Sequence, residues 1–73
     1  MMEFYKKVSE KIRREREARG WSQEEFANEI GMSPCHYGNI ERGKVDMKVN
    51  TIKRIAKGFD INPSELLNFD DTE

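Results

Sequence analysis

Residues 21–43 read WSQEEFANEIGMSPCHYGNIERG, and their pattern predicts two short helices in close succession. Ser22 and Glu25 have the spacing of a capping box, in which each side chain accepts a hydrogen bond from the backbone N–H of the other residue. A helix is therefore expected to begin at Gln23. Gly31 ends it after about two turns.

The second of these helices begins almost at once, because only Gly31 and Met32 precede its N-terminal signal. Ser33 is a favourable N-cap, and Pro34 suits the first helical position because its missing N–H would have no partner there. The helix is expected to continue to about Arg42. Two helices joined by so short a turn cannot lie antiparallel, and they must cross at a large angle.

A longer amphipathic helix is expected before this pair, over residues 3–18. Phe4, Val8 and Ile12 recur every four residues and would form its apolar side. Gly20 follows it and marks its end.

Two further helices are expected after the pair. The fourth is expected over roughly residues 47–58, with Asp46 and Asn50 as alternative start residues. Its apolar side consists of Val49, Ile52, Ile55, Ala56 and Phe59. Asn62 and Pro63 repeat the N-cap and first-position pattern for a short fifth helix. No segment alternates as a strand does, so the sequence predicts an all-α domain over residues 1–69, followed by an acidic tail at 70–73.

The formal net charge is only -1, but the charges are segregated along the chain. Residues 32–58 hold six Lys or Arg and two acids, whereas residues 59–73 hold five acids and no base. Binding to nucleic acid depends on local basic surface rather than on the total charge. The acidic end either solvates the C-terminus or helps to orient the domain away from DNA.

Several classes of function have no support in the sequence. Cys35 and His36 are the only cysteine and the only histidine, so neither a disulfide framework nor a metal site is expected. No nucleophile, base and orienting acid stand together, so we expect no enzyme and no cofactor. The charged N-terminal segment and the lack of a long apolar run predict a cytoplasmic protein without a membrane segment.

From about Lys11 to Leu67 the sequence resembles the lambda Cro/repressor-like helix-turn-helix family, also called the XRE family. The resemblance rests on residues 21–43 quoted above and on TIKRIAKGFDINPSELL at 51–67. It implies a compact five-helix DNA-binding domain whose second and third helices form the helix-turn-helix. It also implies a sequence-specific transcriptional regulator, such as a phage-type repressor, a restriction-modification controller protein or an antitoxin, and the sequence does not choose among these.

The third helix would enter the major groove of double-stranded DNA, which is about 12 Å wide and admits an α-helix. The resemblance places five residues of that helix toward the bases. Asn39 could bond adenine and His36 guanine, whereas Pro34 and Cys35 offer apolar contact and Gly38 would allow close approach. These are modest base readers, so some could be neutral surface, and the shape of the operator would then carry part of the specificity.

Four residues are candidate phosphate contacts. Gln23 begins the second helix, where backbone N–H groups and the helix dipole favour an anion, and its amide can also donate. Arg42, Lys44 and Lys48 follow the third helix and would meet the flanking backbone of DNA. Alternatively, any of these cations is an ordinary solvated side chain.

Arg16 and Glu41 are expected to have a structural role. In some members of the resembled family the equivalent residues form a partly buried salt bridge between the first and third helices. Loss of one partner would leave a charge stranded in the interior.

The regulator is expected to act as a homodimer on a palindromic operator. Leu66, Leu67 and Phe69 are the candidate dimer contacts, although Leu66 and Leu67 could instead close the core. No small-molecule ligand is expected, because no ligand-binding domain is present. The competing hypothesis is a protein-interaction module, or an antitoxin-type partner protein, that uses the same fold.

Overall fold

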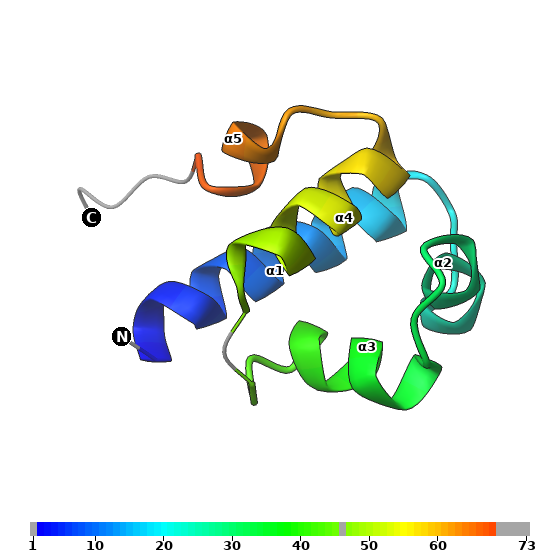
Figure 1. Ribbon diagram of the computed structural model, residues 1–73, viewed down its shortest axis with the longest axis horizontal. Coiled ribbons are helices and arrows are strands. Elements are labelled where there is room, and N and C mark those ends of the chain that lie inside the picture. Colours follow the sequence, from blue (N-terminus) through cyan, green and yellow to red (C-terminus); the bar gives the residue numbers. More distant parts are fainter. Residues whose placement is uncertain (1, 46, 69–73) are drawn as a thin grey trace.

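The computed structural model describes residues 2–45 and 47–68, and within them it contains only helices (Figure 1). The bounds are α1 Met2–Ala18, α2 Gln23–Glu29, α3 Pro34–Glu41, α4 Val49–Phe59 and α5 Pro63–Leu66. The predicted all-α fold with five helices is therefore confirmed. Among these helices, none combines the length and the apolar character that a membrane crossing requires.

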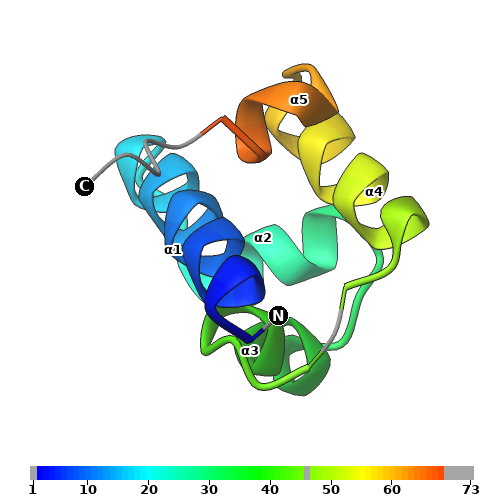
Figure 2. The same ribbon diagram turned by 90° about the vertical axis from the view of Figure 1, so that its left-hand side faces the viewer.

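The helices α2 and α3 cross steeply, as the short turn between them requires. In Figure 1, α2 is seen nearly end-on while α3 lies across the view, and in Figure 2 the reverse holds. The helix α3 lies along the lower edge of the molecule in both views, and α5 lies along the upper edge. The two therefore occupy opposite ends of the fold, and α5 leaves α3 uncovered.

A single apolar core joins all five helices. Phe26 lies at its centre, stacked on Phe59 of α4 with ring centroids 4.2 Å apart and edge-on to Tyr37 of α3 at 5.4 Å. Burial of such aromatic side chains supplies much of the free energy that stabilises a small core. The fully buried side chains around them include Val8, Ile12, Ile40, Ile55 and Leu66.

The start of α4 differs from the prediction. Lys48 is the N-cap and makes no side-chain cap hydrogen bond, while Asn50 lies inside the helix. Asp46, the other predicted start, lies outside the described residues. Val49, predicted for the apolar side, is 67% exposed, so the buried side of α4 begins at Ile52. Phe4 on α1 is likewise 41% exposed.

Leu66 and Leu67, two of the predicted dimer contacts, differ in their exposure to solvent. Leu66 is completely buried, so it cannot contribute to an interface in this conformation, and its place in the prediction is corrected. The reason is that α5 turns this side chain into the core, as the alternative interpretation had it. Leu67 is 41% exposed. Phe69 and the acidic tail at 70–73 lie outside the described residues.

Candidate nucleic-acid interface

The N-terminal half of α3 is presented to solvent. The Ser33 hydroxyl accepts a hydrogen bond from the backbone N–H of His36 at 3.1 Å, and Pro34 occupies the first turn. Pro34, Cys35 and His36 are all exposed. Three of the predicted base readers therefore lie together on an uncovered helix end.

The opposite side of α3 is held by a buried salt bridge to α1. Arg16 donates from Nε to Glu41 Oε2 at 2.6 Å and from Nη2 to Glu41 Oε1 at 3.2 Å. Its Nη1 donates to the backbone carbonyl of Trp21, just before α2. The side chain of Glu41 is only 1% exposed. The expected pairing of Arg16 with Glu41 is thus present, and it connects α1, α3 and the entry to α2.

Glu41 has two further hydrogen-bond donors that sequence analysis did not identify. The hydroxyl of Tyr37, one turn earlier on α3, donates to Oε2, and the amide of Gln23 donates from Nε2 to Oε1 at 2.9 Å. The side-chain spacing of Tyr37 and Glu41, four residues apart on one helix, could have revealed the first contact. The second joins residues 18 positions apart and depends on how α2 crosses α3.

These contacts keep the carboxyl of Glu41 ionised. Burial alone would raise the pKa of Glu41, but hydrogen bonds from Arg16, Tyr37 and Gln23 outweigh it, and the pKa is lowered. The pKa of Arg16 is raised, first through its hydrogen bond with Glu41. Burial, together with the hydrogen bond to the Glu41 carboxylate, raises the pKa of Tyr37. The cluster therefore carries a stable ion pair at neutral pH.

Gln23 has a more constrained position than the sequence predicted. It is partly exposed at the first position of α2, but one of its amide donors is directed to Glu41. The capping box beside it uses the N–H groups of Ser22 and Glu25. A phosphate at this helix end could therefore bond the second amide N–H of Gln23, but not the two N–H groups taken by the capping box.

Gly38 does not reach the surface where a base could approach it. It is buried, because Arg42 and Gln23 lie over it: a Cβ at this position would be 3.3 Å from Arg42 Nη1 and 3.5 Å from Gln23 Oε1. Its interpretation as a groove-facing residue is therefore corrected. The missing side chain instead gives the guanidinium of Arg42 room to fold back along the helix.

Arg42 and Asn39 form one polar unit at the end of α3. Arg42 Nη2 donates to Asn39 Oδ1 at 2.8 Å, which leaves the Asn39 amide nitrogen as a donor. Lys44 and Lys48 follow, and both are exposed. The structure thus gathers Gln23, Arg42 and Asn39 around Gly38, with the two lysines in the segment that leads to α4.

The comparisons with known proteins agree with this geometry. Residues 12–66 match the Helix-turn-helix family over most of the chain. The chain belongs to the helix-turn-helix family. The expected family is therefore confirmed, and α2 and α3 are its two motif helices.

Proteins from Vibrio cholerae, Aeromonas hydrophila and Neisseria are similar to this helix-turn-helix chain. The cryptic phage CTXphi transcriptional repressor RstR of Vibrio cholerae is 36% identical over 64 residues, which cover 88% of this chain and 58% of the repressor. The restriction-modification controller protein C.AhdI from Aeromonas hydrophila is 32% identical, with a TM-score of 0.84 over 89% of this chain and 94% of its own. The hypothetical transcription factor NHTF from Neisseria is 25% identical, with a TM-score of 0.85 over 89% and 75% of the two chains. All three are named as regulators of transcription or of restriction-modification, and none is named as an enzyme.

Proposed function

We propose that this helix-turn-helix protein regulates transcription by binding a palindromic operator in double-stranded DNA as a homodimer, in the cytoplasm. The proposal is supported chiefly by the uncovered N-terminal half of α3 and the exposed basic residues that follow it. Pro34, Cys35, His36 and Asn39 would meet the base edges in the major groove. The relatives include a phage repressor and a restriction-modification controller, and either role fits this geometry.

Arg42, Lys44, Lys48 and the free amide N–H of Gln23 would contact phosphates around the groove. Arg42 is well suited to this role, because its hydrogen bond to Asn39 holds the guanidinium beside the helix end. Because the guanidinium of Arg42 is already held in place before DNA binds, less side-chain conformational entropy is lost on binding. The two acidic side chains of the first turn of α2, Glu24 and Glu25, would limit how closely a phosphate approaches that helix.

Selection of binding sites from a random duplex pool tests this function. A symmetric consensus is expected, with half-sites about one helical turn apart. Binding should weaken as salt rises, and Arg42→Ala should reduce the slope of log K against log salt by about 1. Arg14→Ala removes the same charge from the solvent-facing side of α1 and should leave the slope unchanged. A protein that selects no sequence and shows no salt-dependent binding would instead be an interaction module.

The homodimer is tested separately, by sedimentation equilibrium. Leu67 is the C-cap of α5 and is exposed, and α5 lies at the end of the fold away from α3 (Figure 1). Leu67→Lys should shift the equilibrium toward the monomer and reduce operator affinity more at low protein concentration than at high concentration. A wild-type chain that stays monomeric, with an asymmetric consensus, would contradict this part of the proposal.

A further inference from the structure

The C-terminal end of α2 is electrostatically unfavourable by its own sequence. The last turn contains no basic residue, and the helix ends at Glu29. Backbone carbonyls at a helix C-terminus carry a partial negative charge, and a nearby carboxylate adds to it. The turn that follows is closed by backbone hydrogen bonds from Met32 N–H to the Ala27 carbonyl at 2.8 Å and from Gly31 N–H to the Asn28 carbonyl at 3.2 Å. These bonds bring no positive charge to that end of α2, and it is this turn that leads into α3.

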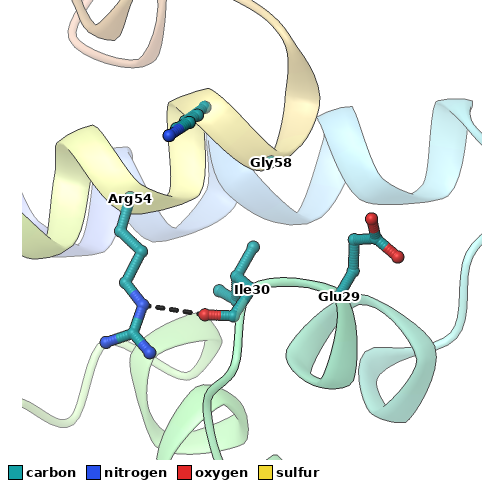
Figure 3. A pocket seen from close by; sticks show the side chains of 5 residues that line it. Glu29, Ile30, Arg54 and Gly58 are labelled. Carbon is teal, nitrogen blue, oxygen red and sulfur yellow. Dashed lines mark hydrogen bonds between the residues drawn. The ribbon is translucent and has the colours of Figure 1, made fainter.

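Arg54 of α4 stabilises this turn from outside α2. Its Nε donates to the Ile30 carbonyl at 2.8 Å (Figure 3). Its Nη2 donates to the Gly31 carbonyl at 2.6 Å. The guanidinium is planar and presents its N–H donors in a fixed fork, so two adjacent carbonyls can be held at once. It also brings a positive charge to the negative end of α2.

The backbone of the turn is shaped to receive this side chain. Gly31 has a φ of +68°, a conformation that other residues rarely adopt, and a Cβ there would lie 3.2 Å from Arg54 Nη2. Gly58, one turn after Arg54, allows α4 to approach: a Cβ at residue 58 would lie 2.4 Å from Ile30 Cγ2. A polar contact and a steric contact on the same side of α4 therefore fix the turn.

We propose that Arg54 is a positioning residue for DNA recognition, which sets the direction of α3 by holding the carbonyls of Ile30 and Gly31. Only Met32 and the N-cap Ser33 separate Gly31 from the start of α3, so a small rotation at the turn would move every base-reading side chain. Displacements of about 1 Å in a recognition element have large effects on its contacts. This inference rests on the proposed DNA-binding function.

The test compares three variants. Arg54→Met removes both hydrogen bonds and the charge. Arg54→Lys keeps the charge but replaces the planar fork by a single ammonium group, which cannot reproduce both bonds. Lys57→Met is the matched control, because Lys57 lines the same surface hollow and carries the same charge. All are measured on the selected operator and on random duplex, at a temperature where circular dichroism shows each variant to be folded.

Both Arg54 variants should lose about tenfold or more of their operator affinity, while their affinity for random duplex and their salt slope stay close to the wild-type values. Lys57→Met should keep the ratio of operator to random-duplex affinity. If Arg54→Lys retains full operator affinity, or Arg54→Met reduces the salt slope by about 1, Arg54 is a phosphate contact and the proposal is overturned.

A DNA-independent measurement separates this inference from the proposed function. In amide NMR spectra, Arg54→Met should shift the resonances of residues 30–36 and increase their hydrogen exchange, whereas Lys57→Met should not. If wild-type protein binds no DNA, the proposed function fails, and these spectra still decide whether Arg54 fixes the turn. Unchanged spectra for residues 30–36 would overturn the positioning role whatever the DNA result.

Discussion

The two ends of α3 are each held by an arginine from another helix, but in different ways. Arg16 of α1 is buried and bonds a carboxylate, Glu41, at the C-terminal end. Arg54 of α4 is exposed and bonds neutral carbonyls of the turn before the N-terminal end. Loss of a buried ion-pair partner leaves an uncompensated charge, whereas loss of an exposed donor returns its acceptors to water. Arg16 should therefore govern stability, and Arg54 the orientation of α3.

The largest expected effect is at the buried end. Arg16→Met should lower the free energy of unfolding by about 3–5 kcal/mol, because it leaves the Glu41 carboxylate buried without its cation. So small a domain has little stability to lose, and urea unfolding should show a partly unfolded protein in dilute buffer.

The double variant Arg16→Met with Glu41→Gln provides the control. It removes both charges and keeps an acceptor for the donors from Tyr37 and Gln23. Its unfolding free energy should lie above that of Arg16→Met alone. A double variant as unstable as the single one would show that packing, rather than the stranded charge, causes the loss.

A fall in pH should weaken the contact of Arg16 at the C-terminal end of α3 and leave the contact of Arg54 before its N-terminal end unchanged. The pKa of Glu41 is lowered by folding, so the folded state binds this proton less readily than the unfolded state. Its contribution to stability is present above the ordinary pKa of 4.5 and is lost as the pH falls through the lower folded value.

Urea titrations between pH 7 and pH 3 should therefore show a loss of stability that is smaller in Glu41→Gln. Arg54→Met, which has no titrating partner in its contact with the turn, should show the same pH dependence as the wild type. An equal pH dependence in Glu41→Gln and the wild type would assign the acid effect to other carboxylates.

A steric change should have an intermediate effect at the Arg54 end. Gly58→Ala places a methyl group against Ile30 and Phe26 and should cost about 1–3 kcal/mol, as overpacking of a core does. Gly20→Ala is not a neutral control, because Gly20 has a φ of +75°, although the space around it is open. Arg14→Ala is the better reference, because Arg14 is exposed on α1. Thermal unfolding would compare the stability of Gly58→Ala with that of Arg14→Ala. A cost within experimental error for Gly58→Ala would show that α4 can move away from the turn freely.

The smallest effect on stability should come from Arg54→Met itself. Exchange of its two hydrogen bonds for water, one partly buried and one exposed, should cost about 1 kcal/mol in urea unfolding, well below the loss in Arg16→Met. The comparison would fail if Arg54→Met were as destabilising as Arg16→Met, because a stability role would then account for Arg54 as well.

Much of this fold could be predicted because its signals are local. Ser22 and Glu25, three residues apart, form the capping box in the structure as they do in the pattern. Ser33 and Pro34 likewise begin α3 where expected. The start of α4 is the exception. Lys48 makes no side-chain cap hydrogen bond, so no residue type marks the boundary. The spacing of Val49 predicts an apolar position, but its side chain is exposed.

The candidate site was only partly predictable. Pro34, Cys35 and His36 are exposed as their helix positions implied, but Gly38 is covered by Arg42, a side chain one turn away whose rotamer no pattern specifies. Leu66 and Leu67 are adjacent and chemically identical, yet one is buried and the other is exposed. The sequence does not distinguish Arg54 from the other basic residues, because it meets its acceptors in the turn only through the packing of α4.

The order and approximate limits of the helices, the tight turn at Gly31 and the charge distribution follow from the sequence by itself, because capping, helical spacing and glycine conformation act over three or four residues. The tertiary structure decided which arginine meets which acceptor and which glycine is covered. The hydrogen bonds that Glu41 accepts from α1 and α2 join residues 18 to 25 positions apart, as in Gln23 with Glu41 and Arg16 with Glu41. Their geometry exists only once the helices have packed around Phe26, so no local pattern encodes it.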